Sequence, residues 1–210
     1  MERNIIAILR GICPNQACSI AEALIESGIT KIEIPLNSLN ALRSIEVMVK
    51  SFEKEIIFGA GTVLNLNQVK DVHNAGGKII VSPNCNVNVI KETKKLNMLS
   101  FPGVFTPSEC FMALNSGADG LKFFPALLIG PNGFSAIKTV LPKNTLTYAV
   151  GGVAPKSFLD WFRVGISGFG VGSALYKNGD TNKQIFSKAK VLIESFDQAL
   201  EKMVASELME

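Results

Sequence analysis

The feature that most constrains the fold of this chain is a regular alternation of eight short apolar runs with amphipathic stretches along its 210 residues. The runs are rich in Ile, Val, Leu and Phe without clean alternation, which is typical of strands that are covered on both faces. They are NIIAILR (4–10), KIEIPL (31–36), IIFGAGTV (56–63), KIIVSP (78–83), LSFPGV (99–104), GLKFFPA (120–126), LTYAVGGV (146–153) and GFGVGSAL (168–175). The strand starts expected within these runs lie about 20 to 26 residues apart, the length of one β-α unit, so the chain is predicted to repeat that unit eight times. These starts are near Ile5, Lys31, Ile56, Ile79, Leu99, Leu121, Leu146 and Phe169.

The stretches between the runs have the apolar spacing of amphipathic helices. One such stripe, at i, i+3, i+4, i+7 and i+8, consists of Ala17, Ile20, Ala21, Leu24 and Ile25. Glycines stand shortly before several runs, where the C-terminus of a helix favours a residue in the left-handed conformation. These glycines are Gly28, Gly76, Gly117 and Gly165. The pattern therefore predicts a helix between each pair of strands.

Eight β-α units without a linker, a low-complexity tract or a charge block favour one α/β domain over residues 1–210. We expect a (β/α)8 TIM barrel with eight parallel strands. The alternative is an open doubly wound sheet, which usually carries a glycine-rich turn after its first strand. Here the first run leads into RGICPNQ (10–16), which contains no G-x-G-x-x-G. The closed barrel is therefore the favoured prediction.

Composition excludes several function classes. The net charge is only +3, and no basic block is present, so nucleic acid is not an expected partner. The single histidine, His73, lies in a polar helical stretch, which argues against a zinc or iron site. The four cysteines form no CxxC pair and are interpreted as reduced thiols; they are Cys13, Cys18, Cys85 and Cys110.

No membrane partner is expected either. No apolar run reaches transmembrane length, and the N-terminus leads straight into IIAILRGI without the features of a signal peptide. The sequence therefore predicts a soluble, cytoplasmic protein.

Charged residues interrupt three of the apolar runs. Active sites of these barrels lie at the C-terminal ends of the strands, so we searched those ends for polar groups. The first run ends in Arg10, the second carries Glu33 between two isoleucines, and the sixth carries Lys122 in GLKFFPA. Burial of an unpaired charge costs several kcal/mol. These three side chains are predicted to converge on one barrel mouth.

Two interpretations of the buried lysine remain open from the residues alone. Lys122 and Glu33 could form an ion pair that closes the barrel, although such pairs are weak stabilisers because of desolvation. Alternatively, burial among Leu121, Phe123 and Phe124, together with the charge of Arg10, keeps the Lys122 amine partly neutral. A neutral amine attacks a ketone and forms a Schiff base, with Glu33 as the proton carrier. We favour the second interpretation.

Glycine-rich loops follow the seventh and eighth runs. Gly151 and Gly152 come after the seventh run, and Gly170, Gly172 and Ser173 end the eighth. Phosphate sites of these barrels often form from the two loops at these places, with backbone N–H groups facing the anion. The residues together predict metal-free Schiff-base chemistry on a phosphorylated sugar derivative.

Seven motifs also resemble a known family in their order along the chain. They are AILRGI, EIPLNS, GAGTVL, SPN, LKFFPA, AVGGV and GVGSALY, and they extend from about Ile5 to Tyr176. The chain resembles the 2-keto-3-deoxy-6-phosphogluconate and -galactonate aldolases. The resemblance implies a class I aldolase on a small barrel, without a cofactor or metal, usually a homotrimer. Such an enzyme cleaves a phosphorylated keto acid to pyruvate and glyceraldehyde 3-phosphate.

Carried over position by position, the resemblance implies that Lys122 is the Schiff-base lysine and Glu33 the general acid/base. The other implied residues contact the keto-acid part of the substrate or its phosphate. They are Arg10, Thr62, Pro83 and Phe124 for the keto-acid part, and Gly151, Gly152, Gly172 and Ser173 for the phosphate.

Two departures distinguish the branches of this family. The gluconate type has an arginine where this chain has Asn37, and it tends to have Thr or Ser where this chain has Val150. The resemblance implies that Asn37 and Val150 are also substrate-binding residues. Both differences resemble the galactonate enzyme, with Arg10 replacing the missing arginine at the carboxylate. The expected substrate is 2-dehydro-3-deoxy-6-phosphogalactonate, and the alternative is the gluconate epimer or 4-hydroxy-2-oxoglutarate.

Three other functions compete with the aldolase prediction. A phosphate-binding epimerase or decarboxylase would use Lys122 only as a cation, but such decarboxylases use an Asp-x-Lys pattern, and this chain has Gly120 at that position. A metal-dependent aldolase is disfavoured by the lone histidine. A non-catalytic phosphosugar-binding protein would need no acid beside the lysine, so Glu33 argues against it.

Overall fold

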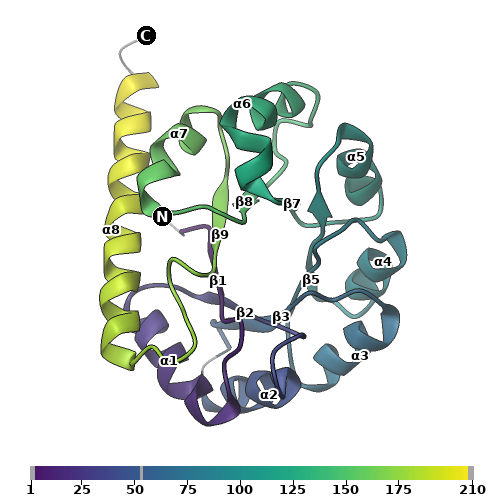
Figure 1. The fold of residues 1–210 in the computed structure, drawn as a ribbon. Coiled ribbons are helices and arrows are strands. Elements are labelled where there is room, and N and C mark those ends of the chain that lie inside the picture. Colours follow the sequence, from purple (N-terminus) through teal and green to yellow (C-terminus); the bar gives the residue numbers. More distant parts are fainter. Residues whose placement is uncertain (1–2, 53, 208–210) are drawn as a thin grey trace.

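Parallel strands form a ring in the computed structural model, which describes residues 3–52 and 54–207. Helices surround the ring on its outside (Figure 1). The strands are β1 (Ile5–Ile8), β2 (Lys31–Pro35), β3 (Ile57–Gly61), β4 (Ile79–Val81), β5 (Leu99–Phe101), β6 (Gly103–Val104), β7 (Leu121–Phe123), β8 (Thr147–Val150) and β9 (Gly168–Val171). The predicted parallel barrel is confirmed.

Nine strands appear instead of the predicted eight, because the fifth run is divided at Pro102. The strand order is β5-β4-β3-β2-β1-β9-β8-β7-β6, and every neighbouring pair is parallel. The first half of the run pairs with β4 up to Phe101, and the second half pairs with β7 from Gly103. Pro102 between them has no N–H for a strand ladder. The ring therefore closes through one run whose two halves pair with different neighbours.

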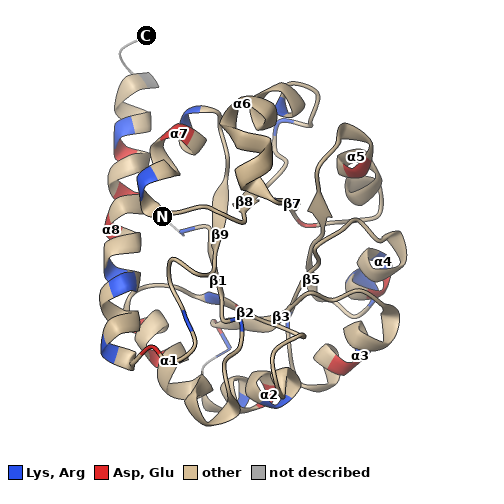
Figure 2. Cartoon of the chain, in the orientation of Figure 1, with Lys and Arg blue, Asp and Glu red and all other residues tan. Residues whose placement is uncertain are grey.

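The helices are mostly where the apolar spacing predicts them. They are α1 (Pro14–Glu26), α2 (Ala41–Ser51), α3 (Leu66–Asn74), α4 (Val87–Lys95), α5 (Pro107–Asn115), α6 (Ala126–Lys138), the short 3-10 helix η1 (Pro155–Ser157), α7 (Phe158–Arg163) and α8 (Asn182–Glu207). The four glycines expected at helix ends all have positive φ. Figure 2 shows the charged residues spread over the outer helices. No helix in the described ranges combines the length and hydropathy needed to span a bilayer.

The long C-terminal helix α8 lies against the first and last helices of the ring. It contacts α1 and α7, and the view of Figure 1 shows it along one side of the barrel. The Phe196 ring of α8 contacts the rings of Phe158 and Phe162 on α7, with centroids 6.2 Å and 5.1 Å apart. The apolar stripe of α8 therefore packs against the first helix of the ring, α1, and against α7 near its end.

Two separate apolar clusters fill the structure. The larger cluster lies between the strands and the helices and includes Leu121 and Phe123. The smaller cluster, which we call the interior cluster, consists of Ile6, Ile79, Val81, Phe101, Tyr148 and Val150. Because side chains alternate along a strand, neighbouring residues of one strand belong to different clusters. This alternation decides which side chains can face the mouth of the barrel.

Candidate active site

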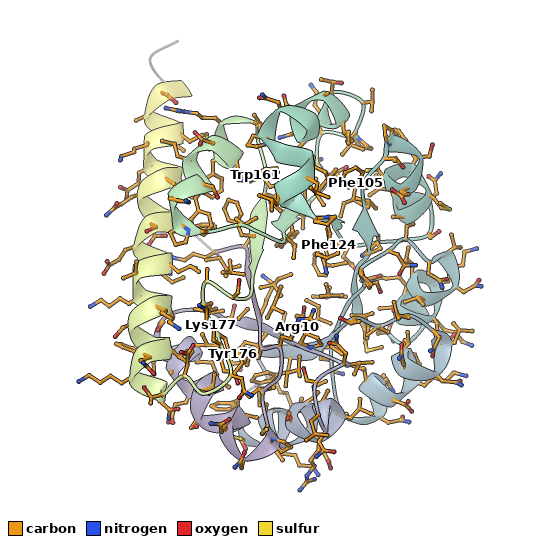
Figure 3. The ribbon with its side chains drawn as sticks, in the orientation of Figure 1. Arg10, Phe105, Phe124, Trp161, Tyr176 and Lys177 are labelled. Atoms are coloured by element: carbon orange, nitrogen blue, oxygen red, sulfur yellow. The ribbon has the colours of Figure 1, made fainter. Side chains whose placement is uncertain are left out.

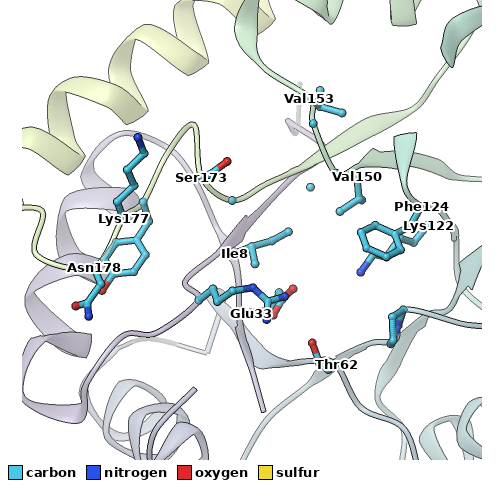
Figure 4. Close-up of a pocket in the computed structure, with 17 residues that line it drawn as sticks. Ile8, Glu33, Thr62, Lys122, Phe124, Val150, Val153, Ser173, Lys177 and Asn178 are labelled. Atoms are coloured by element: carbon cyan, nitrogen blue, oxygen red, sulfur yellow. The ribbon is translucent and has the colours of Figure 1, made fainter. Parts of the chain in front are cut away.

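A cavity of about 430 Å³ opens at the C-terminal ends of the strands (Figure 4). The residues predicted to form the site line this cavity, with the exception of Asn37. The lining residues among them are Arg10, Glu33, Thr62, Pro83, Lys122, Phe124, Val150, Gly151, Gly152, Gly172 and Ser173. They come from seven of the nine strands or from the loops that follow them. The topology therefore brings together residues that are up to 163 positions apart, from Arg10 to Ser173.

Lys122 is placed in the cavity by β7. Its strand neighbours are Gly103 on β6 and Tyr148 on β8, and its side chain is only 7% exposed. The amine Nζ lies 4.7 Å from the centroid of the Phe124 ring. Figure 4 shows both side chains on the same side of the cavity.

The expectation that Leu121 and Phe123 bury the amine is wrong. Both residues belong to the outer cluster, where the Phe123 ring contacts the Phe134 ring with centroids 4.8 Å apart. Alternation along β7 turns them away from Lys122. The groups that surround the amine are instead Phe124 and residues brought by other strands.

Burial lowers the pKa of Lys122, because removal from water disfavours the charged amine. The charge of Arg10 lowers this pKa further, as the sequence predicts, whereas the charge of Glu33 opposes the shift. The direction favours a neutral amine, the form that attacks carbonyl carbon.

Glu33 occupies the centre of β2 and is 2% exposed. Burial raises the pKa of its carboxyl group to about 7, against the opposing charges of Lys122 and Arg10 and a backbone hydrogen bond from Gly61. Its Oε2 has no hydrogen-bond partner within the described part of the chain. A carboxyl group with a pKa near neutrality can both donate and accept a proton at physiological pH.

Gly61 leaves the space that the Glu33 carboxyl group occupies. A Cβ atom at position 61 would collide with both carboxylate oxygens of Glu33. The glycine in GAGTV is therefore required for packing, in addition to its place in the motif.

The direct Lys–Glu ion pair considered from the sequence is not formed. The ion pairs within the described residues lie elsewhere, and none joins Lys122 to Glu33. The two groups influence each other's pKa without a direct bond. Both groups line the same cavity, so both can face a substrate bound there.

Arg10 lies outside β1, which ends at Ile8, so its expected place inside a strand is wrong. Its exposed side chain reaches over the cavity and donates a hydrogen bond from Nη1 to Oδ1 of Asn37 at 2.6 Å. The backbone N–H of Gly11 donates to Oγ of Ser38 at 2.8 Å. Asn37 thus does not line the cavity itself, and it positions the guanidinium that does.

Thr62 has a left-handed backbone conformation with φ of 57°. This conformation is strained for a β-branched residue, and strain of this kind clusters at functional sites. Thr62 lines the cavity together with Pro83, which follows β4. The strained turn directs the threonine hydroxyl group to the mouth of the barrel, as Figure 4 shows.

The two glycine-rich loops form one wall of the cavity. Gly151 and Gly152 have φ of 92° and 79°, and a Cβ at Gly152 would lie 2.8 Å from Cβ of Leu127. A Cβ at Gly170 would lie 2.7 Å from Cγ2 of Val150. These close approaches leave the backbone accessible where side chains would cover it.

Sequence reasoning missed several lining residues: Ile8, Val153, Tyr176, Lys177 and Asn178. The last three follow the second glycine loop in the segment YKN, whose composition is that of an ordinary turn. Tyr176 is 4% exposed, and its hydroxyl group has no partner among the described residues. The sequence did contain one signal: Tyr176, Lys177 and Asn178 follow Ser173 by only three to five residues, so they had to lie near the same loop.

No group of three or more metal-ligating side chains occurs in residues 3–52 and 54–207. Among its lining residues the cavity offers the Lys122 amine, which can act as a nucleophile, and the Glu33 carboxyl group, which can carry a proton.

The family model for KDPG and KHG aldolase matches residues 1–190. The chain belongs to this family. Aldolases are carbon–carbon lyases, and this family is of the class I type, for which a Schiff base is typical. The resemblance seen in the motifs is thereby confirmed.

Related proteins of the aldolase family extend over nearly the whole chain. A protein of Rhizobium meliloti named probable 2-dehydro-3-deoxy-6-phosphogalactonate aldolase is 46% identical over 94% of this chain and 93% of its own. The 2-dehydro-3-deoxy-6-phosphogalactonate aldolase of Escherichia coli is 38% identical over 94% of this chain and 96% of its own. A solved structure described as native KDPGal has a TM-score of 0.93 at 37% identity, covering 96% of this chain and 98% of the other.

Proposed function

We propose that this protein is a class I aldolase that cleaves 2-dehydro-3-deoxy-6-phospho-D-galactonate to pyruvate and D-glyceraldehyde 3-phosphate. The observation that carries the proposal is the pair of buried groups in one cavity: an amine whose pKa is lowered, at Lys122, and a carboxyl group whose pKa is raised to about 7, at Glu33. The names of the relatives support this choice of substrate.

The first step joins the enzyme to the substrate. The neutral amine of Lys122 adds to the C2 ketone and forms a carbinolamine. Glu33 gives a proton to the leaving hydroxyl group, water departs, and an iminium ion remains. The guanidinium of Arg10 and the hydroxyl group of Thr62 hold the carboxylate next to this carbon, so that the ketone stays aligned with the amine.

The second step breaks the C3–C4 bond. A base removes the proton from the C4 hydroxyl group, the C3–C4 electron pair moves toward the iminium, and the aldehyde leaves. The resulting enamine takes a proton at C3, water adds to the iminium carbon, and pyruvate departs while the Lys122 amine is restored. Glu33 is the proton carrier for these transfers, since its pKa near 7 allows it to act as acid and base in turn.

The cavity contains features that favour the galactonate substrate over its C4 epimer. Val150 lines the cavity between the lysine and the glycine loops and offers no hydroxyl group to the substrate. Arg10, fixed by Asn37, supplies the guanidinium for the carboxylate. The two epimers differ in the orientation of the C4 hydroxyl group. An apolar side chain near C4 offers neither orientation a hydrogen bond, and it leaves no polar group of the protein unpaired when the galactonate epimer binds.

A trapping experiment tests the covalent step. The protein is mixed with pyruvate, reduced with borohydride and digested, and the peptides are weighed. We expect an adduct on the peptide that contains Lys122, and none with the Lys122→Met variant, whose fold is checked by circular dichroism. An adduct on another lysine, or activity abolished by a chelator, would contradict the proposed mechanism.

We also propose that the protein assembles as a homotrimer. Five large apolar side chains are exposed on α5 and α6 and just before α5; the two helices follow one another around the ring in Figure 1. They are Phe105, Phe111, Met112, Leu127 and Leu128, with Leu127 75% exposed. Exposed apolar surface of this kind often marks an interface. Sedimentation equilibrium should give three times the chain mass, and a monomeric mass would contradict the assembly.

A cytoplasmic location is part of the same proposal. All four cysteines are free, at positions 13, 18, 85 and 110, which is usual for proteins of reducing compartments. The protein is expected in the cytoplasmic fraction of its cells.

A further inference from the structure

The substrate class proposed above carries a phosphate group, which has close to two negative charges at neutral pH. Backbone N–H groups of Gly151, Gly152 and Gly172 supply partial positive charge at one wall of the cavity. They carry no formal charge, so the cations that line the cavity determine how the dianion is balanced. These cations are Arg10, Lys122 and Lys177.

Two of the three cations belong to the other end of the cavity. Arg10 donates to Asn37 beside β2, and its charge acts on both Glu33 and Lys122. Lys122 lies against the Phe124 ring and shares its surroundings with Glu33. In addition, Lys122 reacts in its neutral form. Neither side chain is free to serve the phosphate.

Lys177 lies on the phosphate side. It stands four residues after Ser173, the last residue of the second glycine loop. Figure 4 shows Lys177 on the same side of the cavity as Ser173, away from Lys122 and Phe124. Figure 3 places it next to Tyr176, to one side of Arg10. Its side chain is exposed, and its charge is felt by the nearby Asp180 carboxylate, whose pKa it helps to lower.

The backbone near Lys177 is fixed while its side chain is left available. The Lys177 N–H donates to Oδ2 of Asp180 at 2.7 Å, which closes the turn. The same carboxylate oxygen accepts a hydrogen bond from Nζ of Lys188 at 2.6 Å. Asp180 is thus already paired with Lys188, and no hydrogen bond or ion pair of the Lys177 side chain occurs among the described residues.

We propose that Lys177 binds the phosphate group of the substrate, as the cationic partner of the backbone N–H groups of the two glycine loops. The inference rests on the proposed function and adds to it a binding residue. The ammonium donates to a phosphate oxygen that the backbone does not reach, and it leaves the chemistry at Lys122 unchanged. Lys177 therefore affects substrate affinity and not the covalent step.

Three variants test this inference. Lys177→Met removes the charge and keeps the length of the side chain, and Lys177→Arg keeps the charge. Lys91→Met is the matched control, because Lys91 is exposed on α4, outside the cavity, and its replacement changes the net charge equally. Each is assayed with the phosphorylated keto acid and with the same keto acid lacking phosphate, and each is trapped with pyruvate and borohydride.

For Lys177→Met we expect a KM for the phosphorylated substrate that is raised about tenfold, the effect of one hydrogen bond to a charged group. We expect kcat within about twofold of the wild type, since the lost contact is equal in ground state and transition state. The KM for the phosphate-free substrate and the yield of pyruvate adduct should not change. Lys177→Arg should recover most of the affinity, and Lys91→Met should behave as wild type.

Inorganic phosphate gives a second measurement. As a competitive inhibitor it should bind the Lys177→Met variant about tenfold more weakly than the wild type. An unchanged KM together with unchanged phosphate inhibition would overturn the assignment of Lys177. If the wild type itself neither cleaves the phosphorylated substrate nor forms a pyruvate adduct, the proposed function fails instead, so the two failures are distinguishable.

Discussion

The two ends of the cavity present different kinds of chemical group. At the end proposed to bind the keto acid, which we call the keto-acid end, Lys122 and Glu33 are side chains of strands, 7% and 2% exposed, with shifted pKa values. At the end proposed to bind the phosphate, which we call the phosphate end, the groups are backbone N–H groups of two loops, the exposed Ser173 and the exposed Lys177. Figure 4 shows Lys122 on one side of the opening and Ser173 and Lys177 on the other.

The difference follows from what each end has to do. Covalent chemistry needs groups with altered proton affinity, and burial in a rigid strand supplies this alteration. Anion binding needs many donors in a fixed array and tolerates contact with water, which loops at helix N-termini supply. Substitutions at the keto-acid end should therefore change turnover, whereas substitutions at the phosphate end should change affinity.

The largest effect is expected at Lys122. Lys122→Met removes the nucleophile, and kcat should fall about 10⁴-fold or more, as for other residues that form covalent intermediates. Steady-state release of pyruvate measures this loss, with Lys91→Met as the control for a missing surface charge. Activity within tenfold of the wild type would remove the basis for a special keto-acid end.

Glu33→Gln should lower kcat by about 10²–10⁴-fold, the usual range for loss of a general acid/base. The pH profile sharpens this test. In the active form, Lys122 and Glu33 together hold one titratable proton. Below about pH 7 this pair binds a second proton and becomes inactive. The kcat/KM of the wild type should thus fall as pH decreases through about 7. In the variant this acidic limb should no longer lie near pH 7.

The same carboxyl group makes stability depend on pH. Its pKa is raised from the ordinary 4.5 to about 7 in the folded state, so between these values the folded state binds more protons than the unfolded state. The free energy of unfolding should therefore decrease as pH rises through this window, by an amount on the order of 3 kcal/mol. Urea denaturation at several pH values measures the difference between the wild type and Glu33→Gln. A difference that does not vary with pH would show that the carboxyl group is ordinary.

At the phosphate end, Gly152→Ala should raise KM for the phosphorylated substrate about thirtyfold and leave kcat nearly unchanged. The new Cβ would lie 2.8 Å from Leu127, and φ of 79° is strained for alanine, so the loop has to shift. Stability should fall by about 1 kcal/mol. Gly117→Ala, at φ of 93° but outside the cavity, is the control for strain alone. A fall in kcat as large as the rise in KM would erase the distinction between the two ends.

The smallest effect is expected between the two ends, at Val150. Val150→Thr introduces a hydroxyl group next to C4 of the substrate, and it should lower the ratio of kcat/KM for the galactonate and gluconate epimers about fivefold. Competition between the two epimers in one reaction measures this ratio directly. An unchanged ratio would show that the side chain at position 150 does not determine which C4 epimer is preferred.

The barrel could be predicted from the sequence because strands covered on both faces are short, nearly continuous apolar runs at regular spacing. Lys122 and Glu33 were found for the same reason, since a charge within such a run stands out. The place of Arg10 was not found, because the end of β1 depends on hydrogen bonds to neighbouring strands and not on composition. The direction of Leu121 and Phe123 follows from alternation, which local hydrophobicity hides.

Residues outside the runs were harder to predict. The division at Pro102 depends on which neighbour each half of the run pairs with, and that is decided by closure of the ring. Asn37 contacts Arg10 only in the folded chain, and Lys177 reaches the cavity from a turn of ordinary composition. These assignments need the three-dimensional arrangement.

The division of the fifth run at Pro102 has a consequence for the reactive amine. The Pro102 carbonyl accepts a hydrogen bond at 2.9 Å from the main-chain N–H of Lys122. The residue at which the barrel closes, Pro102, is thus also the residue that holds the backbone of Lys122. A shift of the chain at Pro102 would therefore be passed to the backbone of Lys122, and closure of the barrel would influence where the amine of the proposed nucleophile lies.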